Sequence, residues 1–240
     1  MSERETRVAI ITGGSQGIGA GLVAAYRRQG WAVVANSRTI EPSTDREVLA
    51  IDGDISEPAT TDRIIGQALE RFGRIDTLIN NAGIFIAKPF TDYTAEDYAS
   101  VVGVNLTGFF LLTQRAIAEM LKRNFGHVVN ITTTLVDYAN SDVPSVLTSM
   151  TKGGLASATK SLAIEYASRG IRVNAVSPGI IQTPMHAPET YDAHALAGRM
   201  PPVGYVGQIS DIVSAILFLE SSPFITGEIL HIDGGQIAGH

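Results

Sequence analysis

Short apolar runs alternate with helical patterns from one end of the chain to the other. Seven runs have the length and composition of buried strands: Arg7–Ile11, Trp31–Ala35, Val48–Ile51, Thr77–Asn80, His127–Ile131, Ile171–Val176 and Glu228–Ile232. Helical spacing is found in Ile18–Gln29, Glu57–Phe72, Ala95–Val102, Thr107–Asn124, Ser149–Ser168 and Ile209–Glu220. Because such alternation builds parallel strands joined by helices, the sequence predicts an α/β fold with a doubly wound, seven-stranded parallel sheet.

One connection in this pattern is short. Only Asn36–Glu47 separates the second strand from the third, and Pro42 interrupts it, so at most one helical turn fits there. Ligands of doubly wound sheets bind beyond the carboxyl ends of the strands. The residues that directly follow each strand are therefore the first to inspect for a site.

Length and composition limit the classes of protein. A chain of 240 residues builds one core, so we expect a single domain over residues 1–240. The absence of Cys excludes disulfides and a thiolate nucleophile, and no His, Asp or Glu cluster has metal-ligand spacing. The net charge of −6 argues against nucleic-acid and anionic membrane partners. No apolar run has transmembrane length and the charged N-terminus lacks a signal-peptide core, so we expect a cytoplasmic protein.

A glycine-rich turn follows the first strand, in the run TGGSQGIG at residues 12–19. Glycines allow a tight turn and a close approach of backbone to a pyrophosphate, and the N-terminus of the next helix favours an anion. The alternative is a glycine-rich turn without a ligand. The strand before it and the helix after it favour a nucleotide site made by Gly13, Ser15, Gln16, Gly17, Ile18 and Gly19.

At this point the chain resembles the short-chain dehydrogenase/reductase family, which has a Rossmann-type fold. The resemblance covers nearly all 240 residues and rests on several motifs: TGGSQGIG at 12–19, Asp54, NNAG at 80–83, Asn105 in VNLTG, Lys152, SPGIIQTPM at 177–185 and ITGEILHIDGG at 225–235. It implies a nicotinamide cofactor. It also implies further cofactor contacts at Asp54, Ile55, Asn81, Ala82, Gly83, Lys152, Gly179, Ile181 and Thr183.

The choice between the two nicotinamide cofactors depends on the end of the second strand. An acidic residue there would hold the adenosine ribose of NAD(H) and repel a 2′-phosphate. This chain has Ser37 at that position, followed by Arg38, and a hydroxyl next to a guanidinium suits a phosphate. A solvated arginine at a strand end is the alternative reading of Arg38. We predict NADP(H) rather than NAD(H).

The catalytic residues depart from the family's Asn–Ser–Tyr–Lys set, in which the tyrosine carries the proton. Asn105 and Lys152 match the set, and Thr133 keeps a hydroxyl at the serine position. Thr148 stands four residues before Lys152, where the resemblance places the tyrosine. An aliphatic alcohol is a poor acid at neutral pH, so the chain is predicted to be a divergent member without the usual proton donor.

A longer segment follows the fifth strand. Thr133 and Thr148 are fifteen positions apart, where the family usually has thirteen, and the additional length falls near Tyr138. Tyr138 either replaces the missing acid or packs on the loop surface. Residues 184–206 are expected to form a substrate lid, in which His186 and Tyr191 either contact substrate or remain solvated.

Three functions remain open from the sequence. The first is an NADP(H)-dependent oxidoreductase of a small carbonyl or alcohol, with a proton from Tyr138 or from a water held by Asn105, Thr133 and Lys152. The second is a cofactor-binding pseudoenzyme or sensor, and the third is a non-redox enzyme on the same scaffold. By resemblance we also expect a homo-oligomer, a dimer or tetramer, formed through the helices Thr107–Asn124 and Ser149–Ser168.

Overall fold

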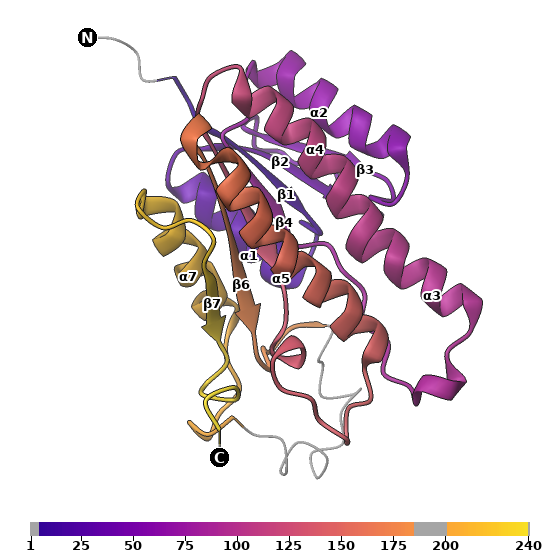
Figure 1. Cartoon of the computed structure of the whole chain (residues 1–240). Coiled ribbons are helices and arrows are strands. Elements are labelled where there is room, and N and C mark those ends of the chain that lie inside the picture. Colours follow the sequence, from indigo (N-terminus) through magenta and orange to yellow (C-terminus); the bar gives the residue numbers. More distant parts are fainter. Residues whose placement is uncertain (1–4, 185–200, 240) are drawn as a thin grey trace.

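The computed structural model describes residues 5–184 and 201–239 and has one parallel sheet at its centre (Figure 1). Its strands are β1 (Val8–Thr12), β2 (Ala32–Ser37), β3 (Val48–Asp52), β4 (Thr77–Asn80), β5 (Gly126–Ile131), β6 (Ile171–Pro178) and β7 (Ile229–Ile232). They lie in the order β3-β2-β1-β4-β5-β6-β7, and every neighbouring pair is parallel. The predicted doubly wound sheet of seven strands is confirmed, and its strand boundaries differ from the predicted ones by at most two residues.

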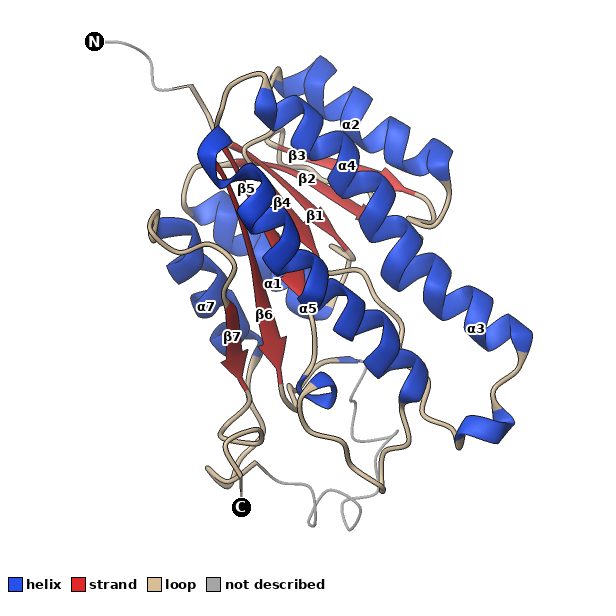
Figure 2. Ribbon diagram, in the orientation of Figure 1, coloured by secondary structure: helices blue, strands red, loops and turns tan. Residues whose placement is uncertain are grey.

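Helices cover both faces of the sheet (Figure 2). They are α1 (Gly17–Arg28), α2 (Pro58–Phe72), α3 (Ala95–Val102), α4 (Phe109–Leu121), α5 (Val146–Tyr166) and α7 (Ile209–Ser221). Side chains of β1 alternate between two cores: Val8 and Ile10 pack with α2, α4 and α5, whereas Ala9 and Ile11 pack with α1 and α7. This two-sided burial explains why the strands appear in the sequence as continuous apolar runs.

The connection from β2 to β3 contains no helix, as the short spacing and Pro42 predict. The sheet therefore lacks a covering helix between these two strands. Ser37 at the end of β2 and Asp52 at the end of β3 are paired in the parallel ladder, so both strands end at the same edge of the sheet.

The expected break between two helices at residues 103–106 is wrong. The chain continues from α3 into α4 through a π-helical segment, Gly103–Gly108, so that residues 95–121 form one helical run. By length and mean hydropathy (1.3) this run could cross a membrane, but its apolar face, including Leu112 and Met120, is buried in the core. Such wide turns inside α-helices are rare and frequently occur at functional sites.

Candidate active site

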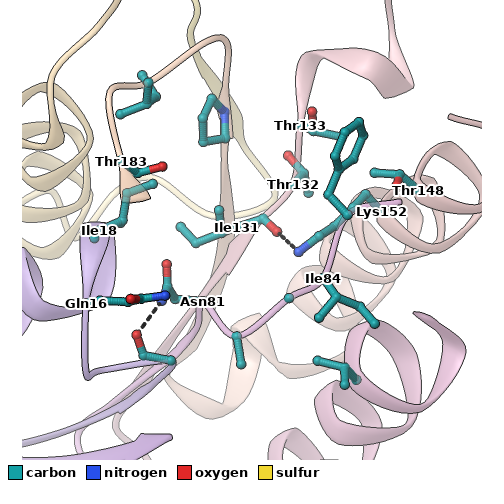
Figure 3. Close-up of a pocket in the computed structure, with 18 of the residues that line it drawn as sticks. Gln16, Ile18, Asn81, Ile84, Ile131, Thr132, Thr133, Thr148, Lys152 and Thr183 are labelled. Carbon is teal, nitrogen blue, oxygen red and sulfur yellow. Dashed lines mark hydrogen bonds between the residues drawn. The ribbon is translucent and has the colours of Figure 1, made fainter. Parts of the chain in front are cut away.

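A cavity of about 370 Å³ opens at the carboxyl ends of the strands (Figure 3). Nearly all of the predicted site residues line it: Gly13, Ser15, Gln16, Gly17, Ile18, Ser37, Arg38, Asp54, Ile55, Asn81, Ala82, Gly83, Thr133, Tyr138, Thr148, Lys152, Gly179, Ile181 and Thr183. Gly19 and Asn105 do not line it. Gln236 after β7 lines it too, so segments that follow all seven strands meet in one cavity, as expected for a doubly wound sheet.

The glycine-rich turn between β1 and α1 has the geometry of an anion site. Gly13 and Gly17 have φ values of +66° and +55°, which favour glycine. Gln16 precedes α1 without a side-chain hydrogen bond to the helix end, and the first turn holds no acidic residue. The N–H groups of that turn and the positive end of the helix dipole therefore face the cavity, where a pyrophosphate would fit.

Gly19 has a packing role instead of a contact with the cavity. A Cβ atom on it would lie 2.0 Å from the backbone oxygen of Gly13 and 2.8 Å from Nδ2 of Asn81. Asn81 Nδ2 in turn donates to the Thr12 oxygen at 2.9 Å, and Thr12 Oγ1 accepts from the N–H groups of Asn81 and Ala82. These contacts fix the glycine-rich turn against the loop after β4.

The ends of β2 and β3 form the distal part of the cavity. Ser15 Oγ donates to Ser37 Oγ at 2.9 Å, and the exposed Arg38 lines the cavity beside them. Burial acts to raise the pKa of Asp54, but hydrogen bonds from Ser56 and the charge of Arg38 outweigh it and lower that pKa. The hydroxyls of Ser15 and Ser37 and the guanidinium of Arg38 thus line the same part of the cavity.

Lys152 lies at the other end of the cavity, on α5. Its side chain is buried, and Nζ donates to the carbonyl oxygen of Ile131 at 2.7 Å. Burial lowers the pKa of Lys152 to about 8. A Cβ on Gly83 would lie 3.1 Å from Nζ, so the glycine leaves room above the ammonium group.

Asn105 lies behind this end of the cavity, in the π-helical segment. Its Oδ1 accepts from the Ile84 N–H at 3.0 Å, and its Nδ2 donates to the Ile84 oxygen at 3.1 Å and to Thr151 Oγ1 at 3.2 Å. Both ends of the amide hold protein groups, so in this structure Asn105 is a positioning residue for the loop after β4. The role of Asn105 in holding a catalytic water stays a prediction.

Thr133 and Thr148 differ although both line the cavity. Thr133 Oγ1 accepts from the Leu135 N–H at 3.4 Å, which leaves its own proton to donate. Thr148 Oγ1 is buried and has no hydrogen-bond partner within residues 5–184 and 201–239. The neighbouring Ser149 does not line the cavity, and its Oγ donates to the Leu135 oxygen at 2.9 Å.

The loop after β5 brings Tyr138 to the cavity. Tyr138 lines it together with Asn140 and Val143, so it is not confined to the loop surface. The adjacent Asp137 pairs with His231 of β7 at 3.1 Å. His186 and Tyr191 of the expected lid lie outside the described residues.

Sequence reasoning missed the apolar part of the wall. Phe85, Leu135, Val143 and Ile180 line the cavity near its catalytic end. They lie in loops after β4, β5 and β6, where a hydrophobic residue has no periodic pattern to mark it. Within the described part of the chain, no group of three metal-ligating side chains is present.

The chain is similar to known reductases and dehydrogenases over nearly its whole length. The family model described as enoyl-(acyl carrier protein) reductase matches residues 13–236. The 3β-hydroxysteroid dehydrogenase 1 of Eggerthella lenta is 35% identical, with 96% of this chain and 93% of that protein covered. Two solved structures superpose well: ElxO with NADP bound (29% identity, TM-score 0.89, 98% and 100% covered) and a 3-ketoacyl-(acyl-carrier-protein) reductase from Brucella melitensis with NADH (30%, 0.89, 97% and 99%).

The fold, the cavity and these likenesses define a nicotinamide-dependent oxidoreductase with a Rossmann-type sheet. The chain belongs to the short-chain dehydrogenase/reductase family.

Proposed function

We propose that this protein is an NADP(H)-dependent oxidoreductase that interconverts a small carbonyl compound and its alcohol with an altered catalytic set. The single observation that carries the proposal is the continuity of the cavity. One space of about 370 Å³ runs from the anion site at the glycine-rich turn to Thr133 and Lys152. A cofactor held at one end would thus present its nicotinamide to a substrate at the other.

The preference for the phosphorylated cofactor rests on charge at the ends of β2 and β3. Ser15, Ser37 and Arg38 offer two hydroxyls and a guanidinium, and no carboxylate replaces Ser37. A 2′-phosphate would gain charge-assisted hydrogen bonds there. The bound NADP of ElxO and the bound NADH of the Brucella reductase show that relatives of this fold take either cofactor.

When bound, the cofactor would supply or accept the hydride at the substrate carbon. The chain's own groups then have three tasks. Thr133 Oγ would donate a hydrogen bond to the substrate oxygen, Lys152 would hold the nicotinamide ribose, and Phe85, Leu135 and Val143 would exclude water around an apolar substrate. The oxidoreductases among its relatives favour this function over a pseudoenzyme or a non-redox enzyme.

Fluorescence titration with NADPH and NADH tests the cofactor. Wild type should bind NADPH more tightly, Arg38→Ala should weaken NADPH by about tenfold without affecting NADH, and Ser37→Asp should reverse the preference. Arg28→Ala, an exposed arginine on α1 far from the cavity, is the matched control. Tighter binding of NADH by wild type would refute the choice of NADP(H).

Turnover is tested with neutral carbonyl compounds (benzil, benzaldehyde and ethyl acetoacetate), followed as loss of NADPH absorbance. Reduction of at least one of them is expected. If NADPH binds but none of a broad carbonyl and alcohol panel reacts, the protein is a cofactor-binding pseudoenzyme.

We further propose a cytoplasmic homo-oligomer, a dimer or tetramer, that buries the outer faces of α4 and α5. Three large apolar side chains are exposed there, Phe110, Met150 and Ile164, the last at 82%. Such residues are typical of an interface between subunits. Ile164→Asp should lower the molar mass measured by light scattering, and an unchanged mass would exclude this face.

A further inference from the structure

The catalytic end of the cavity holds few groups that can carry a proton. Among the described residues that line the whole cavity, the ionisable side chains are Arg38, Asp54, Tyr138 and Lys152. Arg38 and Asp54 lie at the distal end, beside Ser37. Tyr138 and Lys152 are therefore the remaining ionisable groups for proton transfer at the catalytic end.

Lys152 is placed by rigid elements. It lies on α5 one turn after Thr148, so both side chains share a helix face, and the small threonine leaves open the space before the ammonium group (Figure 3). One N–H donates to the Ile131 oxygen at 2.7 Å, at the end of β5, two residues before Thr133. An ammonium group has three N–H bonds, so two remain for a ribose and a substrate oxygen.

Tyr138 is held by a loop, whereas Lys152 is held by a helix. It lies on the loop after β5, four residues beyond Thr134, and that loop is tied to the sheet edge through the pair of Asp137 with His231. A general acid needs hydrogen-bond reach of the atom that it protonates. The helix holds Lys152 at the same end of the cavity as the Thr133 hydroxyl.

We propose that Lys152 is the catalytic proton donor of this enzyme, in place of the tyrosine; this rests on the proposed function. In reduction, a bound NADPH would supply a hydride to the carbonyl carbon, leaving NADP⁺, and the π electrons of the C=O bond would move to oxygen. That oxygen takes a proton from Lys152 Nζ: an N–H bond breaks, an O–H bond forms, and the lysine becomes a neutral amine. Water then returns a proton to it, and oxidation of the alcohol runs the same steps backwards.

The proton affinity of Lys152 suits this task. Burial lowers its pKa to about 8, so the ammonium form predominates at neutral pH and still releases a proton readily. Arginine in its place would keep the positive charge and could hold the ribose, but it does not release its proton in this pH range.

The first test reads the proton directly. The chain has four lysines, Lys88, Lys122, Lys152 and Lys160, so ε-¹³C-lysine labelling gives a simple NMR spectrum. One signal should titrate near pH 8 and be absent from Lys152→Arg. Titration of all four signals together at the ordinary lysine value would overturn the proposal.

The second test separates proton transfer from cofactor binding. In Lys152→Arg, kcat for carbonyl reduction should fall by about 100-fold or more. Its Kd for NADPH, measured by fluorescence, should change by less than about tenfold. In wild type, kcat for reduction should decrease above the pKa of Lys152, because the acid must be protonated. Retention of wild-type kcat by Lys152→Arg would overturn the proposal and leave the proposed function intact.

Chemical rescue makes the test independent of a damaged fold. Lys152→Ala should bind NADPH, lack turnover, and regain it with ethylammonium or other small amines, with a rate that depends on the pKa of the added amine. A structural role would give no such dependence. Loss of turnover in Tyr138→Phe together with no amine rescue would assign the proton to Tyr138, and a wild type that reduces no carbonyl would defeat the proposed function and this role with it.

Discussion

The two ends of the central sheet both carry buried polar side chains, but they use them differently. At the amino ends of the strands, Glu220 Oε2 accepts hydrogen bonds from Tyr26 OH (3.1 Å), Thr77 Oγ1 (3.0 Å) and His127 Nδ1 (3.0 Å). Asn174 Nδ2 contacts the other ring nitrogen of His127 at 3.1 Å. In this Glu220 network (Tyr26, Thr77, His127, Asn174 and Glu220), each member is bonded to another.

At the carboxyl ends, by contrast, polar side chains of residues that line the cavity lack a full set of hydrogen-bond partners. Thr148 Oγ1 has no partner in the described structure, Thr133 keeps a proton to donate, and Lys152 is held by one backbone carbonyl. Incompletely satisfied buried polar groups cost stability and are kept where a ligand completes them. The Glu220 network at the amino ends therefore stabilises the fold, whereas the polar groups at the carboxyl ends are available to cofactor and substrate.

The largest expected loss of stability comes from removing the acceptor of the Glu220 network at the amino ends of the strands. Glu220→Leu keeps the approximate volume but leaves three buried donors without an acceptor, which should lower the free energy of unfolding by about 3–5 kcal/mol. Urea denaturation measures this loss. Glu70→Leu, at an exposed position on α2, is the matched control and should change stability by less than about 0.5 kcal/mol. Equal losses of stability in the two variants would show that the Glu220 network does not stabilise the fold.

The next effect concerns the carboxyl end. Gly19→Ala places a Cβ 2.0 Å from the Gly13 oxygen, so the glycine-rich turn must shift. Overpacking of this kind costs about 1–3 kcal/mol, and we expect NADPH affinity to fall by roughly tenfold to hundredfold. Gly66→Ala in α2, where a Cβ meets nothing within 4 Å, is the control and should stabilise by up to about 1 kcal/mol. Unchanged NADPH binding in Gly19→Ala would mean that this turn does not hold the cofactor.

A third prediction follows from the charges of the amino end. Burial lowers the pKa of His127 and outweighs the carboxylate of Glu220, which acts to raise it. For Glu220, burial acts to raise the pKa, but hydrogen bonds from His127 and Thr77 outweigh it and lower that pKa. Both groups bind a proton more weakly in the folded state, so the unfolded state gains protons first as the pH falls. The free energy of unfolding should therefore decrease as the pH falls below 6.5, the ordinary pKa of histidine. The slope is at most about 1.4 kcal/mol per pH unit for each proton taken up on unfolding.

Urea midpoints at pH 7.5, 6.5 and 5.5 check this slope. His127→Gln should flatten it, whereas His231→Gln, in the partly exposed pair with Asp137, should retain it. A slope that is the same in wild type and His127→Gln would show that the buried histidine does not set the pH dependence.

The same division explains what the sequence could predict. The glycine-rich turn and the strand ends are local patterns, so the fold and the nucleotide end of the cavity follow from residues such as Gly13, Gly17 and Ser37. The π-helical segment around Asn105 has no local signature in the sequence. A π-helical turn differs from an α-helical turn in its backbone hydrogen bonds, which span five residues instead of four, and not in its amino-acid composition. The burial of Lys152 and the unpartnered Thr148 oxygen depend on how α5 packs against β5, which a single sequence does not specify.

The smallest effect tests the cavity side directly. Thr148→Val removes a buried hydroxyl that has no partner within the described residues and keeps the shape of the side chain. Since an unsatisfied buried polar group costs about 1–3 kcal/mol, the variant should be more stable by about 1 kcal/mol in urea denaturation. Thr159→Val on the same helix is the matched control, because Thr159 Oγ1 accepts from Asn130 Nδ2 and donates to the Leu155 oxygen, and it should be destabilised. A loss of stability in Thr148→Val would show that its hydroxyl is bonded in solution, and the contrast between the two ends of the sheet would fail at this residue.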